Sequence, residues 1–127
     1  MPRAKEDHIV RQTEEIAIGC AMGGFLEMLT RPWTLHIIWL LSANGPMRFG
    51  ALRRSAEGIS ARLLTVRLRT LEERGFVKRT VRPTNPPEVT YSPTSRLKEM
   101  EGFMKQLHGL SDKWQREDRG RHELKVA

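Results

Sequence analysis

The segment 60–74 constrains the fold more than any other part of the chain, because it has the marked beginning, face and end of a helix. Ser60 is a favourable N-cap residue, and Gly75 follows where a C-cap glycine is expected. At about 100° per residue, three leucines stack on one side. They are Leu64, Leu68 and Leu71. The sequence therefore predicts an amphipathic helix anchored in a core along this line.

The opposite side of the predicted helix carries groups suited to the major groove of DNA. Arg62 and Arg69 can donate to phosphates or, bidentately, to guanine O6 and N7. Thr65 can hydrogen-bond to a base or a phosphate, and the methyl groups of Val66 can contact a thymine methyl. The alternative is a solvated helix with ordinary surface arginines, because basic helix faces are common.

The rest of the chain is divided by glycine and proline stops. Helices are predicted at 21–29, 33–42 and 48–55, strands at 76–82 and 88–92, and a final helix from 94 to about 116. This order predicts a mainly α fold with a small β-ribbon, a winged helix-turn-helix. We expect an N-terminal arm at 1–19, the domain at 20–116 and a charged, frayed tail at 117–127.

Basic residues also gather in the predicted wing, residues 76–92. Lys78, Arg79 and Arg82 lie just before a proline-stiffened tip at 83–87, and Arg48 adds a cation at the start of the helix 48–55. Such a tip can lie over the minor groove or the phosphate backbone while the helix occupies the major groove. This arrangement favours duplex DNA as the partner.

Composition supports a polyanionic partner and gives no sign of catalysis. The chain of 127 residues has a formal net charge of +7, and its N-terminus lacks an apolar leader, so a cytoplasmic protein, nucleoid-associated when bound to DNA, is expected. A single cysteine excludes a disulfide framework within the chain. The four histidines lack metal-ligand spacing, so no enzyme activity, metal or cofactor is predicted, and His36 is interpreted as a hydrogen-bonded core residue.

An ordered set of motifs over about 20–114 resembles the HxlR-type winged-helix transcriptional regulators, relatives of the MarR group. The matching segments are Trp33-Thr34-Leu35, Gly45-Pro46-Met47-Arg48-Phe49-Gly50-Ala51-Leu52, the run from Gly58 to Arg69, the run from Leu71 to Arg79, and Pro86-Pro87-Glu88-Val89-Thr90-Tyr91-Ser92. The resemblance implies a homodimer that binds operator DNA of dyad symmetry. It places Arg62, Thr65 and Arg69 at recognition-helix positions and the basic wing residues at backbone contacts. Ser60 and Val66 are further candidate DNA-binding residues of the same helix.

The last predicted helix has more apolar surface than so small a core should need. Its stripe consists of Leu97, Met100, Phe103, Met104, Leu107, Leu110 and Trp114. We expect part of it to pack against a second subunit, with residues 9–29 as a further contact, so that N- and C-terminal helices form the dimer. The alternative is that the whole stripe lies against its own domain.

Two kinds of effector are compatible with the sequence. Cys20 resembles, by position, the cysteine through which several family members sense oxidants, quinones or aldehydes, and the alternative is a buried, inert thiol. The proline that usually follows this cysteine in the family is replaced by Ala21. Large apolar residues can also line a cavity for a small apolar ligand, or simply belong to the core. They are Phe25, Met28, Trp33, Trp39 and Met47.

The sequence thus predicts a homodimeric, sequence-specific DNA-binding regulator, with repression as the default. A rival prediction is a basic module that binds RNA or an acidic partner without operator specificity. Neither an aromatic RNA-binding sheet nor a membrane-binding helix face is evident, since aromatic residues make up 6% of the chain. The operator, the regulated genes and the effector are not encoded in any motif we identify.

Overall fold

The computed structural model describes residues 21–126, and the chain divides into two compact units at residues 36 and 37. The first unit contains α2 (Ala21–Leu29) and the beginning of α3 (Thr34–Asn44). The bounds of α2 agree with the sequence prediction. The predicted N-terminal arm, 1–19, lies outside the described residues, as does Cys20.

The start of α3 differs from the prediction because of the backbone at Trp33. Its φ is 75°, in the left-handed region, so it cannot be part of a right-handed helix, and α3 begins one residue later. The indole ring of Trp33 stacks on the ring of His36, with 5.3 Å between centroids. His36 is exposed, so the interpretation of this histidine as a core residue is wrong.

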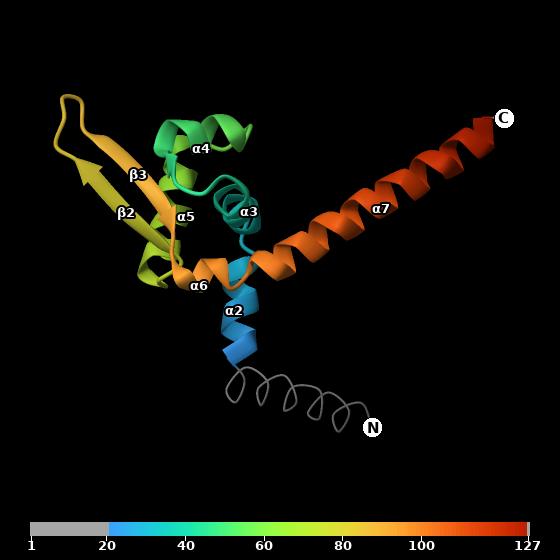
Figure 1. The fold of residues 1–127 in the computed structure, drawn as a ribbon, viewed down its shortest axis with the longest axis horizontal. Helices are drawn as coiled ribbons and strands as arrows, with labels where there is room; N and C mark the ends of the chain where they lie inside the picture. The colour runs from blue at the N-terminus through green and yellow to red at the C-terminus, as the bar shows by residue number, and fades with distance from the viewer. Residues whose placement is uncertain (1–20, 127) are drawn as a thin grey trace, which may run out of the picture. The chain divides into compact units, whose positions relative to one another are not determined.

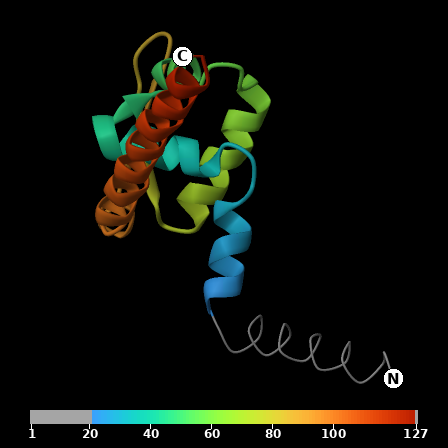
Figure 2. The same ribbon diagram turned by 90° about the vertical axis from the view of Figure 1, so that its right-hand side faces the viewer.

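The second unit contains the helix-turn-helix, the sheet and the last helices (Figure 1). Its further elements are β1 (Met47–Arg48), α4 (Phe49–Ser55), α5 (Ala61–Glu73), β2 (Val77–Arg82), β3 (Glu88–Pro93), α6 (Ser95–Lys98) and α7 (Glu101–Val126). Figure 1 places α3 between α5 and the start of α7, and the view turned by 90° shows the length of α3 (Figure 2). The mainly α winged-helix fold is therefore confirmed.

The sheet has three antiparallel strands in the order β1-β3-β2, where the sequence predicted a ribbon of two. The additional strand, β1, is only two residues long and pairs with β3 through Met47 opposite Tyr91. A strand of two residues is too short to show an alternating pattern, and its pairing partner lies some forty residues away in the chain. The sequence therefore gives no local signal for it. It ties the start of α4 to the sheet.

The core of the second unit consists of aliphatic side chains from four helices. Eight large side chains are fully buried: Ile37, Ile38, Leu41, Leu52, Leu64, Leu68, Leu71 and Leu97. Five of them are leucines at helical spacing on α4, α5 and α6, so burial follows the predicted apolar faces. This packing fixes the rotation of α5 and hence the direction of its polar side.

The C-terminal segment forms two helices, α6 and α7, rather than the single helix predicted. α7 continues to Val126, so the predicted helix end near Arg116 is wrong. Its last turns contain Glu117 and Arg121, oppositely charged residues four positions apart, a spacing that stabilises an exposed helix. The ring of His108 on α7 stacks on that of Trp39 on α3, with 5.0 Å between centroids.

Candidate nucleic-acid interface

Helix α5 presents the stripe expected of a recognition helix. Ser60 caps it, since its side-chain oxygen accepts a hydrogen bond from the backbone N–H of Leu63 at 3.1 Å. While the three leucines point inward, Arg62 and Arg69 are exposed, and 43% of Val66 is exposed between them. Two guanidinium groups therefore flank a small apolar side chain on the outer side of one helix.

Thr65 occupies a different place from the one expected. It lies at the flank of α5 rather than opposite the leucines, because it follows the buried Leu64 directly, and it is half-buried. Its hydroxyl donates a hydrogen bond to the carbonyl of Ala61 at 2.8 Å. Because a hydroxyl has one donor and two acceptor sites, Thr65 in this state can accept a further hydrogen bond but not donate one.

The alternation of β2 divides the basic residues of the wing between the two faces of the sheet. Arg79 pairs with Tyr91 on the face toward α5. Lys78 and Arg82 belong to the other face, and Arg82 lies opposite Glu88. All three basic side chains are exposed. The cluster that appears continuous in the sequence is thus two separate sets, with Arg79 alone beside the recognition helix.

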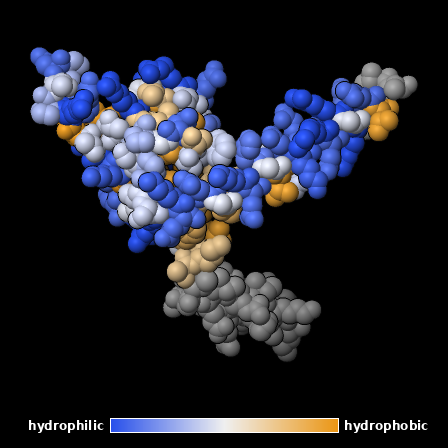
Figure 3. Space-filling view, in the orientation of Figure 1, coloured by the Kyte–Doolittle hydropathy of each residue, from blue (hydrophilic) through white to orange (hydrophobic). Residues whose placement is uncertain are grey.

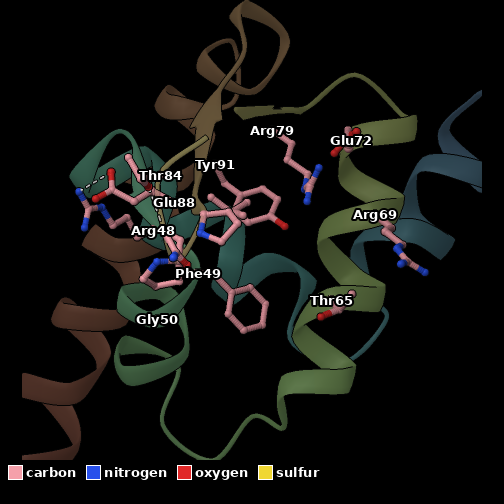
Figure 4. Close-up of a pocket in the computed structure, with 14 residues that line it drawn as sticks. Arg48, Phe49, Gly50, Thr65, Arg69, Glu72, Arg79, Thr84, Glu88 and Tyr91 are labelled. Atoms are coloured by element: carbon pink, nitrogen blue, oxygen red, sulfur yellow. Dashed lines mark hydrogen bonds and ion pairs between the residues drawn. The ribbon is translucent and has the colours of Figure 1, made fainter. Parts of the chain in front are cut away.

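A cleft of about 880 Å³ lies between α5 and the sheet (Figure 4). Figure 4 shows Arg79 extending from the sheet toward α5, near Glu72, whereas Arg69 points from α5 away from the sheet. The hydroxyl end of Tyr91 and the ring of Phe49 also face this space. Arg79 therefore projects into this space, which the aromatic groups of Tyr91 and Phe49 also line.

On the other face, a carboxylate pairs with two arginines. Nη2 of Arg48 donates to Oε2 of Glu88 at 3.1 Å, and Nη1 of Arg82 lies 4.0 Å from the same oxygen. Each arginine side chain is more than half exposed, while 31% of the Glu88 side chain is exposed. Arg48 and Arg82 are thus held around one carboxylate next to the tip of the wing.

Positive charge is concentrated in this part of the chain. Residues 48–82 contain 10 Lys and Arg and 3 Asp and Glu, a net +7, which equals the formal net charge of the whole chain. The remaining 12 basic and 12 acidic residues cancel. The hydrophilic surface around the sheet and α4 is visible in Figure 3. A field of one sign over α4, α5 and β2 attracts a polyanion.

The apolar stripe at the C-terminus has a buried and an exposed part. Leu97, Met100 and Met104 are buried in the second unit. The other four predicted residues are 40–54% exposed: Phe103, Leu107, Leu110 and Trp114. They recur at helical spacing on α7, where apolar surface is visible in Figure 3. Only this exposed part is free to contact another molecule.

The residues proposed for a small-ligand cavity belong to both units. Met28 is buried, and Trp39 is engaged in the stack with His108. Among residues 21–126, no three or more His, Cys, Asp or Glu side chains cluster as a metal site. Over the same range, none of the helices combines the length and the apolar character needed to cross a membrane.

The family model for HxlR-like helix-turn-helix proteins matches residues 28–119, which include every element of the interface. The HTH-type transcriptional regulator sll1512 of Synechocystis is 34% identical over 95 residues, which cover 75% of this chain and 70% of that protein. The transcriptional regulator YtfH of Salmonella typhimurium superposes with a TM-score of 0.67 at 28% identity, covering 82% of this chain and 92% of that one.

Two further solved structures are redox-related. The redox regulator HypR in its reduced form has a TM-score of 0.64 at 30% identity, covering 72% of this chain and 90% of its own. The transcriptional regulator YodB of Bacillus subtilis in its reduced form has a TM-score of 0.63 at 27% identity, covering 74% of this chain and 92% of that one. A quinone-bound form of YodB gives a TM-score of 0.63 as well.

Proposed function

The chain belongs to the HxlR-like helix-turn-helix family of transcriptional regulators, and from this premise we propose that it is a homodimeric repressor that reads an inverted-repeat operator. It is a regulator and not an enzyme. The observation that carries the proposal is the outer side of α5. There two exposed arginines flank Val66 within the segment that holds the net positive charge.

The recognition step follows from the donors on α5. Arg62 and Arg69 present the bidentate fork that matches guanine O6 and N7 in the major groove. Val66 between them leaves room for close approach and offers methyl groups to thymine. Thr65, whose hydroxyl proton is engaged by Ala61, accepts from the amino group of adenine or cytosine rather than donating to a phosphate.

The wing supplies phosphate contacts that hold the protein in register. Arg79, on the face toward α5, reaches the backbone that borders the same groove. Arg48, Lys78 and Arg82, together with the proline-containing tip 83–87, contact the neighbouring backbone or minor groove. The assignment of these residues to different DNA contacts is supported by the alternation of β2, which places Arg79 and Arg82 on opposite faces of the sheet.

The exposed stripe on α7 supplies the second requirement, a dimer. The stripe exposes apolar side chains to water, which is unfavourable, and a second copy of α7 can cover them. They are Phe103, Leu107, Leu110 and Trp114. A twofold dimer presents two recognition helices, which must be separated by about 34–36 Å to enter successive major grooves on one DNA face. A dimer seated on an operator that overlaps a promoter excludes polymerase, which is the proposed route to repression.

Release by an effector is proposed to act through the dimer geometry. The similarity to HypR, a redox regulator, and to YodB, solved in quinone-bound and diamide-treated forms, supports a thiol-reactive effector acting at Cys20. A small apolar ligand is the alternative effector. In either case a change in the separation of the two recognition helices weakens operator binding without any contact at the DNA surface.

The experiment that tests this function compares three nucleic acids at several salt concentrations: a duplex with an inverted repeat selected from the source genome, a scrambled duplex and a structured RNA. We expect the selected duplex to bind at least about 10³-fold more tightly than the scrambled one at physiological salt. Equal affinity for all three would favour the rival, a basic module without operator specificity.

A further inference from the structure

We propose that Glu88 limits the affinity of this regulator for DNA by competing with the phosphates for Arg48 and Arg82. The inference rests on the proposed DNA-binding function and adds a residue that no DNA-contact pattern would select, because its charge has the same sign as the phosphates. The inference is based on two distances: Oε2 of Glu88 lies 3.1 Å from Nη2 of Arg48 and 4.0 Å from Nη1 of Arg82.

The sheet places the three side chains together. β3 is the central strand, with β1 on one side and β2 on the other. Arg82 lies directly opposite Glu88 in the register, and Arg48 lies opposite Thr90, two positions along the central strand. Residues two positions apart share a face, so the carboxylate is flanked by one arginine from each neighbouring strand.

The position of this cluster brings it within reach of a bound duplex. Arg82 and Glu88 are the residues that immediately precede and follow the tip 83–87. Any phosphate that the tip approaches is therefore near both side chains. More than half of the surface of each arginine side chain is exposed to solvent. A phosphate can therefore reach both arginines without a change in the fold.

The strength of the ion pairs suits a competitor rather than a structural clamp. Exposed salt bridges contribute little to stability, so a phosphate can displace the carboxylate at modest cost. Because the same exchange occurs on the operator and on a non-specific duplex, it lowers both affinities by a similar factor and leaves their ratio unchanged. Glu88 therefore limits how tightly the protein holds any duplex, while base contacts by α5 set the preference for the operator.

The test measures binding of a scrambled duplex and of the operator as a function of salt, for the full chain and for Glu88→Gln. Removal of the carboxylate should raise affinity for the scrambled duplex by about 3- to 10-fold at moderate salt, and steepen the slope of log K against log salt by about one to two. Operator affinity should rise by a similar factor, so that the ratio of the two affinities stays unchanged.

Three further variants keep the result interpretable. Glu99→Gln removes an exposed carboxylate on the segment between α6 and α7, and should change scrambled-duplex affinity less than twofold if net charge alone is not responsible. Adding Arg48→Gln to Glu88→Gln should remove a large part of the gain and return about one unit of slope. Glu88→Ala provides a second removal of the carboxylate in which no amide is introduced.

The outcomes separate this inference from the proposed function. Unchanged scrambled-duplex affinity and slope in both Glu88 variants would overturn the inference while leaving DNA binding intact. So would a parallel loss of affinity for both duplexes together with a lower melting temperature, because that pattern is the signature of a structural clamp. A wild-type chain that binds no duplex would overturn the proposed function itself.

Discussion

The guanidinium of Arg96 donates a hydrogen bond to the backbone carbonyl of Arg74 at 2.8 Å, and so joins the first turn of α6 to the C-terminal end of α5. Its Cζ also lies 5.8 Å from the centroid of the Phe76 ring. Nearby, the Thr94 hydroxyl donates to the carbonyl of Gly75 at 2.6 Å and accepts from the N–H of Leu97. The end of the recognition helix is thus bonded directly to the segment that leads into α7.

Arg96→Ala should lower the free energy of unfolding by about 1 kcal/mol, because it removes a charged donor at a helix C-terminus and a cation–π contact. Urea unfolding followed by circular dichroism measures this change. Lys98→Ala, at an exposed position on the same short helix, is the matched control and should change it by less than about 0.5 kcal/mol. Equal effects of the two substitutions would contradict a specific role for Arg96.

Arg62→Ala and Arg69→Ala should each reduce discrimination between the operator and single-base variants of it. The expected cost is about 1–3 kcal/mol at one operator position per arginine, because a bidentate contact to a base edge is lost. Competition binding with a set of single-base operator variants measures the loss position by position. If operator preference survives both substitutions, the outer side of α5 is not the reading surface.

Arg79→Ala should weaken binding to all duplexes by a similar factor, since a phosphate contact contains no sequence information. The slope of log K against log salt should become shallower by about one. Arg116→Ala on α7 is a control that removes the same charge far along the chain and should leave the slope unchanged. A change in the order of preferred operator sequences in Arg79→Ala would assign that residue to base recognition instead.

Leu107→Asp should shift the protein toward monomer, because it places a charge in the exposed stripe of α7. Sedimentation velocity at micromolar concentration measures the change. Lys105→Asp introduces the same group on the opposite side of the helix, about 200° from Phe103, and should have little effect on association. A wild-type protein that is only monomeric while its operator binding is intact would remove the dimer from the proposal.

Cys20→Ser should abolish release from the operator by diamide or a quinone if the thiol is the sensor. Because the chain contains no second cysteine, a disulfide formed with diamide must join Cys20 to another subunit or to a small thiol, whereas a quinone adds to the thiol directly. Operator binding with and without oxidant, and non-reducing electrophoresis of the same samples, measure both steps. An unchanged oxidant response in Cys20→Ser would leave the apolar ligand as the proposed effector.

Much of the fold could be predicted because its strongest signals are local. The helix α5 combines a cap, an apolar stripe and a terminal glycine within sixteen residues, and the structure confirms Ser60 as its N-cap. The strands beside the tip 83–87 are equally local, since proline and alternation define them. Ile37, Ile38 and Leu41, within the predicted helix 33–42, are fully buried.

The errors concern relationships between distant residues. Strand β1 exists because Met47 finds a partner in Tyr91, which no window of neighbouring residues reveals. The two-sided arrangement of Arg79 and Arg82 follows from alternation, yet a count of basic residues places them in one cluster. The Glu88 pairing requires three strands in register. The sequence predicts Trp33 as the first residue of a helix, because its residue type does not indicate the left-handed backbone that the structure shows there.

The concentration of net positive charge in 48–82 means that ionic strength acts on two equilibria to different degrees. Counterions displaced from the duplex are the thermodynamic driving force at the reading surface, so added salt should release the nucleic acid steeply. Subunit association through the exposed apolar stripe of α7 depends on the removal of apolar surface from water. Simple salts weaken this association little. A rise in salt concentration should therefore release the DNA while the proposed dimer stays together, ready to bind again when the salt falls.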